Sequence, residues 1–512
     1  MITPSEQQRL AASTVHVGTQ ALVLFLGNAF TLCVGLPLQI YVARILGAAD
    51  LGIFALIEAA TGLLSGLLSF GIATAVVKFI PQHLEKGEFQ SIKRLLLRGG
   101  VVLGIGGGLA YVGMVLLSPS ALIWWPELAQ YKAVIDVMAL LTPLGLLMFF
   151  FQQGLRGFQE IRYVVIGSSV LQLTVKALLT VVLLATGFGL LGYATAVVLS
   201  TSAAAIWMFV GLWRKVTGLP RNIETSIADN ASAWRSYAAV MYSNSLLGLI
   251  AAHLGRFVLA AFFGPSPVGV WSVVTQLYVL PNVILNMLIA AAVPMFSAAH
   301  ARDDSAERQH LFHLVTDWSV RAALPLILFF LIFGDLLLRL YGEEFAVTGR
   351  YALWIMSGAQ AINLSFGPLG YMLNVTGLEK AALRLAAFQA LLTLAGFVTL
   401  VPLWGLNGAA ITSTGAIVFI NIAEFALARR RLGLKWWSPR YLKWLLPGVI
   451  ASASGILFRI GVAMNSSVLE LVIAFLLVYS IFQIVSLAQG LNPDDRTLLT
   501  NVRGRLSRTA EA

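Results

Sequence analysis

The sequence predicts an all-α polytopic membrane protein with about fourteen transmembrane helices, and three observations support this class. Of the 512 residues, 58% are hydrophobic and 11% are charged, whereas a soluble domain carries about 25% charge. Apolar stretches of roughly twenty residues follow one another, and each is long enough to cross a bilayer. A pattern of short motifs in the first half returns in the second. Together they predict two pseudo-symmetric six-helix bundles followed by two C-terminal helices.

The expected spans follow the apolar stretches in chain order. They cover approximately residues 17–43, 52–77, 99–118, 134–154, 164–186, 190–212, 237–263, 268–296, 318–338, 351–375, 385–403, 406–428, 444–463 and 468–490.

Three short motifs recur in the same order at almost one offset. The pairs are Gly47–Phe54 with Gly264–Trp271, Gly157–Glu160 with Gly377–Lys380, and Gly189–Gly192 with Gly405–Gly408, at offsets of 217, 220 and 216 residues. Three ordered matches indicate that the chain contains two copies of one half. Many transporters are built in this way, with the substrate site between the two copies. Each copy holds an even number of spans, so both copies are expected to enter the membrane in the same orientation.

The duplication divides the chain into six predicted parts. These are a cytoplasmic N-terminal segment (1–16), a first six-helix bundle (17–213), a cytoplasmic linker (214–236), a second six-helix bundle (237–428), two additional helices with a preceding basic loop (429–490) and a cytoplasmic tail (491–512).

The net charge is +11, and the basic residues are divided unevenly between the two expected sides of the membrane. With the N-terminus inside, the inner segments hold 25 of the 34 Lys and Arg residues, and the outer segments hold four. This asymmetry follows the positive-inside rule and predicts that both termini are cytoplasmic. We therefore interpret the basic character as topology and contact with anionic headgroups, and we expect no nucleic-acid partner.

Nothing in the chain predicts catalysis, a metal site or a bound cofactor. It has no His/Glu zinc motif and no phosphate-binding Gly-Lys-Ser/Thr loop. The single cysteine, Cys33, excludes a disulfide framework. The outer connections are too short for a soluble catalytic domain. Gly100, Gly104 and Gly108 form small-xxx-small steps, which predict close helix packing in the third span.

Four ionisable residues lie deep within predicted spans: Glu58, Lys176, His253 and Arg256. A charge at a helix centre costs about 2.5–3.5 kcal/mol on insertion scales, so each needs a reason. Lys176, His253 and Arg256 can each carry a positive charge, and Glu58 is the one acid among the four. This balance suits an anionic, phosphate-bearing substrate. Arg256 can hold two oxygens at once.

Each of these residues also has a plainer interpretation. Lys176 can be structural and neutralised by an acid elsewhere, and His253 can donate a hydrogen bond to a neighbouring helix. Glu58 is either a counter-charge to the cations or a site for coupling to H⁺ or Na⁺. Arg44 lies near the outer mouth of the first span and joins the predicted substrate-binding set.

Other polar residues gather in spans 1, 7 and 8. The offset of 217 places Gln39 opposite Arg256 in the duplicated frame, and Asn244, Asn282 and Asn286 lie in spans 7 and 8. We expect these side chains to line a wet cavity and to meet substrate, with interhelical hydrogen bonding as the alternative. A solvated or snorkelling role is expected for ionisable residues near span ends. These are Lys78, Asp136, Arg321, Asp335, Glu424 and Arg459.

Several local sequences carry a family resemblance over nearly the whole chain. They are Ala43–Gly47 with Gly52, Leu340–Phe345, Asn374–Gly377 and Gly405–Ala410. The chain resembles the Wzx-type polysaccharide or O-antigen flippases of the multidrug/oligosaccharidyl-lipid/polysaccharide exporter superfamily. Relatives often have Asp-Arg where this chain has Gly255-Arg256, so the acid of that coupling scheme is missing here and Glu58 is the substitute to test.

The resemblance implies a multi-pass protein of the bacterial cytoplasmic membrane. Its expected activity is to move an undecaprenyl-diphosphate-linked oligosaccharide from the inner to the outer leaflet by alternating access. That step serves O-antigen, lipopolysaccharide or exopolysaccharide synthesis. Association with polysaccharide assembly proteins and drive by an ion gradient also follow from the resemblance.

Three alternatives stay open. A multidrug exporter of the same superfamily would need more acids facing the cavity, because its cargo is cationic. A lipid II flippase would differ mainly in its cargo. A membrane glycan polymerase or ligase would recognise the same carrier lipid but should present a large outer loop with catalytic residues.

Overall fold

A computed structural model describes residues 4–124, 126–220, 231–462, 467–490, 492 and 494–495. Within these ranges every regular element is helical, and ten helices are long and apolar enough to cross a membrane. The predicted all-α membrane class is confirmed. The predicted count of about fourteen spans is not confirmed, partly because two of the ten helices each combine two segments across a bend.

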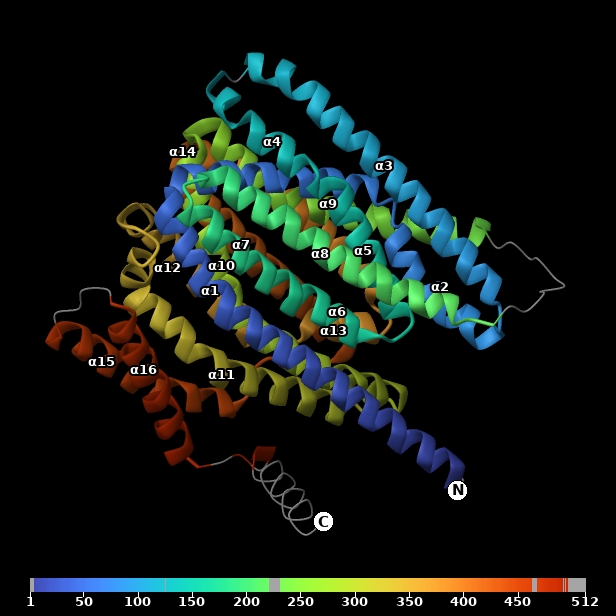
Figure 1. Ribbon diagram of the computed structural model, residues 1–512. Helices are drawn as coiled ribbons and strands as arrows, with labels where there is room; N and C mark the ends of the chain where they lie inside the picture. Colours follow the sequence, from blue (N-terminus) through green and yellow to red (C-terminus); the bar gives the residue numbers. More distant parts are fainter. Residues whose placement is uncertain are drawn as a thin grey trace, which may run out of the picture. The chain divides into compact units, whose positions relative to one another are not determined.

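Contacts divide the chain into two compact units, residues 1–269 and 270–512. The elements that begin in the first unit are α1 (Pro4–Leu68), α2 (Ile72–Lys86), α3 (Phe89–Trp124), η1 (Pro126–Tyr131), α4 (Lys132–Ala139), α5 (Leu141–Gly157), α6 (Ile161–Val165), η2 (Ile166–Leu171), α7 (Gln172–Ala185), α8 (Gly189–Thr217), α9 (Ala231–Phe263) and α10 (Pro265–Ala301) (Figure 1).

The second unit contains most of α10 and all later elements. They are α11 (Ser305–Arg339), α12 (Glu343–Phe366), α13 (Leu369–Val375), α14 (Glu379–Leu432), η3 (Pro439–Trp444), α15 (Leu445–Gly461) and α16 (Val468–Ala488). The predicted linker and tail boundaries stay predictions, because residues 221–230 and 496–512 lie outside the described residues.

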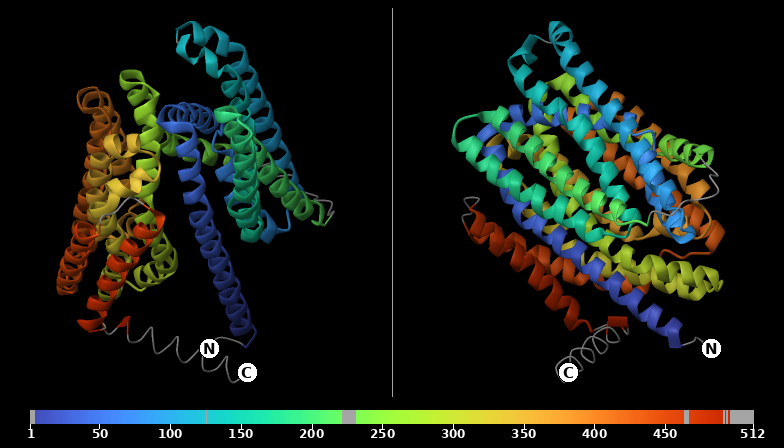
Figure 2. Two further views of the ribbon diagram at one scale, coloured as in Figure 1. Left: turned by 60° about the vertical axis from the view of Figure 1, so that its left-hand side comes forward. Right: turned by 45° about the vertical axis from the view of Figure 1, so that its right-hand side comes forward.

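Two long helices are sharply bent where the sequence predicts one span to end and the next to begin. Gly47 in α1 has φ 74° and ψ 175°, and Gly405 in α14 has φ 53° and ψ −130°. Glycine adopts such positive φ values without the Cβ clash that other residues meet. The bend in α1 is visible in Figure 2, where the dark blue helix turns sharply.

The backbone conformation repeats along with the motifs. Gly47 has φ 74° and Gly264 has φ 76°, at the offset of 217, while Gly189 and Gly405 have φ 50° and 53°. In the third pair, the left-handed residue is Gln159 in the first copy (φ 61°) and Gly377 in the second (φ 77°). The register there is therefore 218 residues rather than the 220 indicated by the motif. Three turns of matching conformation support the duplication independently of residue identity.

Two repeated glycines meet in a reciprocal close contact inside the first unit. A Cβ added to Gly52 of α1 would lie 1.8 Å from the carbonyl oxygen of Pro265, and one added to Gly269 of α10 would lie 2.0 Å from that of Ala48. Residues 48 and 265, and residues 52 and 269, are equivalent in the duplicated frame. The contact is thus reciprocal, because each glycine meets the carbonyl oxygen of the residue four positions before the other glycine.

The core of the first unit forms where α2, α3, α5 and α8 pack. Ile80, Phe150 and Met208 are among its fully buried side chains. The glycines that pack α3 closely are Gly99, against Phe150, and Gly107, whose added Cβ would lie 2.8 Å from Pro143 Cα. Gly104 and Gly108 face open space, so the packing prediction was wrong for these two. Hydropathy alone could not show which helix face meets α5.

The core of the second unit lies between α10, α11, α13 and α14, with Phe296, Phe312 and Met372 fully buried. Helices α15 and α16 lie side by side (Figure 2) and both contact α11. Asp335 of α11 and Arg459 of α15 form an ion pair of 2.7 Å. The expected snorkelling role was wrong for both, because each finds its partner on a neighbouring helix.

A buried polar cluster fastens the segment after α16 to α11. Arg321 donates to both carboxylate oxygens of Asp495 at 2.8 Å and pairs with Asp317 at 2.8 Å. Asp317 also accepts hydrogen bonds from Trp444 at 2.8 Å and Asn492 at 3.1 Å. Arg321 is therefore a half-buried structural cation that binds two buried carboxylates, which corrects the expectation that it is solvated.

Replacing Arg321 with leucine should lower the free energy of unfolding by about 3 kcal/mol or more, because two buried carboxylates would lose their shared cation. Thermal unfolding in detergent measures this. The matched control is Arg302→Leu, because the Arg302–Glu307 pair is solvent-exposed and such pairs contribute about 1 kcal/mol at most. Equal losses in the two variants would contradict the structural role of Arg321.

Acid should loosen this cluster. Burial would raise the pKa of the Asp495 carboxyl, but hydrogen bonds from Arg321 and Trp318 outweigh burial and hold that pKa below its ordinary value of 3.8. The resulting stabilisation is present above pH 3.8 and is lost as the pH falls through the lower folded-state value. Unfolding temperatures measured between pH 6 and pH 3 should decline less in Asp495→Asn than in the unmodified protein.

Candidate functional site

Two of the deep charged residues face each other inside the first unit. Arg256 of α9 places Nη1 3.9 Å from Oε2 of Glu58 on α1. The Arg256 side chain is 22% exposed and that of Glu58 is 52% exposed. A pair this long and this open is weakly held. The guanidinium therefore retains donors that a ligand can use.

Lys176 of α7 lies against an aromatic ring. Its Nζ atom is 5.3 Å from the ring centroid of Tyr193 on α8, which is within cation–π range. Tyr193 is buried, and its ring centroid lies 4.6 Å from that of Phe54 on α1. Glu58 is an electrostatic neighbour of Lys176, without an ion pair between the two.

His253 lies one helical turn before Arg256 and packs against α1. A Cβ added to Gly62 would lie 3.4 Å from His253 Cε1, so the ring lies close to the backbone of α1 at Gly62. His253 Nδ1 is buried and forms no hydrogen bond with the described residues. Glu58 and Arg256 are its electrostatic neighbours. The alternative of a hydrogen bond to a neighbouring helix has no partner there.

The first unit thus gathers three predicted residues from α7 and α9, Lys176, His253 and Arg256, around the carboxylate of Glu58 on α1. With His253 neutral, the group carries one net positive charge, and a second when His253 is protonated. Lys, Arg and His side chains are all donors that can bind phosphate oxygens. The arrangement is suited to bind an anion and unsuited to bind an organic cation.

The other predicted residues of the first unit lie before the Gly47 bend or outside the described side chains. Arg44 is exposed and Gln39 is half-buried, both on the first segment of α1. Asn244 lies on α9, but its side chain falls outside the described residues. Their substrate-binding roles stay predictions.

Asn282 and Asn286 lie on α10 in the second unit. Asn363 of α12 donates to Asn282 Oδ1 at 3.5 Å, and Asn421 of α14 donates to Asn363 Oδ1 at 3.1 Å. This chain of amides joins three helices, which is the structural alternative considered for Asn282. Asn286 is exposed. Contact of either residue with substrate stays a prediction.

Sequence reasoning missed Tyr193. It follows the repeated Gly189–Gly192 motif directly, and that position was the only available signal. The role of Tyr242 was also missed: its hydroxyl donates to the carbonyl oxygen of Leu67 at 2.7 Å and ties α9 to α1. Both roles depend on which helices are neighbours, which local sequence does not show.

The Tyr193 ring should matter more than its hydroxyl. Replacing Tyr193 with leucine removes the surface that Lys176 faces and should reduce transport by roughly threefold to thirtyfold, the range for losing a cation–π contact. Tyr193→Phe keeps the ring and should retain most activity. The check is transport rate at matched protein levels, and equal losses in both variants would contradict the cation–π role.

Solved membrane transporters share this fold. An inward-facing multidrug resistance MATE family transporter of the MOP superfamily aligns with a TM-score of 0.62 at 16% identity, over 79% of this chain and 94% of its own. The lipid II flippase MurJ, in an inward closed conformation, gives 0.66 at 14%, over 91% and 98%. A MOP superfamily transporter from Pyrococcus furiosus gives 0.58 at 14%, over 82% and 95%. The fold is that of MOP superfamily transporters.

Residues 17–300, more than half of the chain, match the family model described as polysaccharide biosynthesis protein. The chain belongs to this family, as the sequence resemblance predicted. No curated protein sequence matches it significantly.

Proposed function

We propose that the protein is a flippase that moves an undecaprenyl-diphosphate-linked oligosaccharide from the inner to the outer leaflet of the bacterial cytoplasmic membrane. Membership of the polysaccharide biosynthesis family and the fold of MOP superfamily transporters support this proposal. The activity is transport, without covalent chemistry on the cargo.

The physical task is to carry a charged, sugar-bearing head across hydrocarbon. The lipid tail can remain in the bilayer, but ionised diphosphate and hydroxyl groups lose their hydration at a large cost unless other partners replace water. Cationic and polar side chains at span depth supply such partners. Alternate exposure of that site to the two sides moves the head without exposing it to acyl chains.

The observation that carries the proposal is the group of Lys176, His253 and Arg256 around Glu58. Arg256 can bind two diphosphate oxygens together, while Lys176 contributes a point charge held against Tyr193. The pair of Arg256 with Glu58 is long, so an incoming diphosphate can compete for the guanidinium. Glu58, released in that exchange, is then free to take up a proton or Na⁺.

Cells that lack the protein provide the test. Lipid-linked oligosaccharides are extracted and assigned to a leaflet by their accessibility to an impermeant glycan-modifying enzyme. The proposal predicts that complete units accumulate on the inner leaflet. Unpolymerised units on the outer leaflet would instead identify a polymerase and overturn the proposal.

A lipid II flippase is the second candidate, because the MurJ fold extends over 91% of this chain. Both cargoes present a diphosphate, so the cationic group fits either. Rescue of a strain depleted of its lipid II flippase separates them. A multidrug exporter fits less well, since an organic cation would meet Arg256 and Lys176, whose one acidic neighbour among the described residues is Glu58.

A further inference from the structure

A long acid-free stretch follows the last helix of the predicted second bundle. No Asp or Glu occurs between Glu424 and Glu470, whereas seven Lys and Arg residues do. Six of them fall within residues 429–446, which comprise the end of α14, η3 and the start of α15. We call this segment the basic platform. It also contains three tryptophans and a tyrosine.

Hydrogen bonds to α11 and α12 hold the platform in place within the second unit. Gln309 of α11 forms two hydrogen bonds of 2.8 Å with the backbone of Lys435, one with its N–H and one with its carbonyl. Trp436 donates from Nε1 to the carbonyl oxygen of Ser365 at 3.0 Å. Tyr441 stacks on Trp444 with ring centroids 4.2 Å apart. The platform therefore has a defined shape rather than that of a flexible basic loop.

Two basic residues of the platform bind the segment after α16. Arg440 pairs with Asp494 at 2.7 Å, and Lys443 donates to Asn492 at 3.0 Å. The other basic residues, Arg429–Arg431 and Lys435, are exposed. No hydrogen bond or ion pair joins their side chains to the described part of the chain. Two of the six basic residues therefore hold the segment after α16, and the side chains of the other four are exposed to a ligand.

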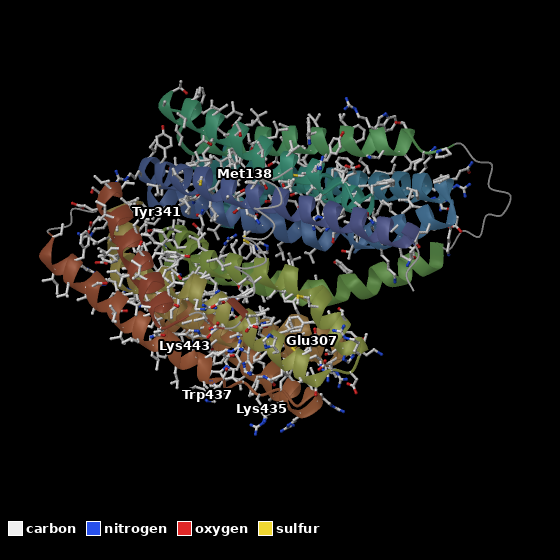
Figure 3. All side chains as sticks on the ribbon, turned by 90° about the horizontal axis from the view of Figure 1, so that it is seen from below. Met138, Glu307, Tyr341, Lys435, Trp437 and Lys443 are labelled. Atoms are coloured by element: carbon white, nitrogen blue, oxygen red, sulfur yellow. The ribbon has the colours of Figure 1, made fainter. Side chains whose placement is uncertain are left out.

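Large apolar side chains lie beside the available charges. Trp437 and Leu442 are each 54% exposed, and Leu445 is 63% exposed. Figure 3 shows Lys435 and Trp437 at the margin of the second unit. Exposed tryptophan is typical of the membrane–water interface, where one part of the ring meets hydrocarbon and the other meets water. Basic residues at the same depth attract anionic headgroups.

We propose that the basic platform is a binding surface for the headgroups of anionic phospholipids of the inner leaflet. Arg429–Arg431 and Lys435 contact headgroup phosphates, while Trp437, Leu442 and Leu445 enter the acyl boundary. The positive-inside rule accounts for charge in this position but requires neither a fixed shape nor adjacent apolar anchors. The platform and the cationic group of the first unit have no residue in common.

Quenching of tryptophan fluorescence by brominated lipids tests this. The full-length protein is reconstituted in phosphatidylcholine containing a fixed fraction of either brominated phosphatidylglycerol or brominated phosphatidylcholine. The difference between the unmodified protein and Trp437→Phe reports on Trp437. We expect this component to be quenched at least about threefold more effectively by the anionic lipid, and the preference to fall with added salt.

A matched pair of double variants separates the platform from general positive charge. Arg430→Gln with Arg431→Gln removes two exposed charges from the platform, and Lys380→Gln with Arg384→Gln removes two exposed charges from the start of α14. The first should abolish the preference and the second should preserve it. Equal quenching of Trp437 by both lipids in the unmodified protein would overturn the proposal, as would equal behaviour of the two double variants. Because the experiment measures quenching of Trp437 and not transport, its outcome is independent of the proposed function.

Discussion

Arg256→Ala should strongly slow transport of the proposed cargo, a lipid-linked oligosaccharide, while leaving protein levels normal. A bidentate, charge-assisted contact to a diphosphate is worth about 1.5–3 kcal/mol per hydrogen bond, so its loss should slow transport by at least about tenfold to hundredfold. Lys176→Ala should act in the same direction, and the double variant should fail to rescue a deletion strain. The measurement is surface polysaccharide in the complemented strain.

Two further variants sharpen this prediction. Arg256→Lys keeps the charge but loses the planar fork, so partial activity is expected. Arg350→Ala removes an exposed arginine that stacks on Tyr351, 4.5 Å from the ring centroid, and should leave transport unchanged. Full rescue by Arg256→Ala and by Lys176→Ala would remove the site hypothesis.

Gly52→Ala should produce the second large effect, a loss of folded protein or of transport. The added Cβ would lie 1.8 Å from the carbonyl oxygen of Pro265, and a backbone atom cannot move aside as a flexible side chain can. Overpacking of this kind costs about 1–3 kcal/mol or more. Gly269→Ala should act similarly, through the carbonyl oxygen of Ala48 at 2.0 Å. Unfolding temperature in detergent and transport rate are the two readouts.

The glycines of α3 provide the control. An added Cβ at Gly104 would meet nothing within 4 Å, so Gly104→Ala should be neutral or slightly stabilising, since alanine favours helix. Because Gly52 and Gly269 belong to one crossing, their combined effect should be smaller than the sum of the single effects. Additive losses, or a Gly104→Ala effect as large as that of Gly52→Ala, would contradict the reciprocal contact.

The sequence could predict much of the fold, because hydrophobic length and glycine placement act locally. The two long helices bend at Gly47 and Gly405, between spans that hydropathy had already separated. The duplication was also visible, although its register at Gln159 and Gly377 shifted by two residues. At that turn the conformation repeats while the residue type does not, so motif matching alone followed the wrong pair.

The sequence indicated which residues belong to the candidate site, but it did not indicate how they are arranged in space. Depth within spans singled out Glu58, Lys176 and Arg256, since burial of charge is costly wherever it occurs. Their grouping, and the ring of Tyr193 beneath Lys176, depend on which helices pack together. The same limit explains Arg321, whose partner Asp495 is 174 residues away in the chain.

Access of water to the cationic group is the most direct test. In a background with Cys33→Ser, cysteines are introduced at positions 176, 256 and, as a lipid-facing control, at the exposed apolar position Leu109 of α3. We expect a small, water-soluble thiol reagent to modify the cysteines at positions 176 and 256 but not the one at position 109. No modification at positions 176 and 256, or equal modification at position 109, would contradict a hydrated diphosphate site.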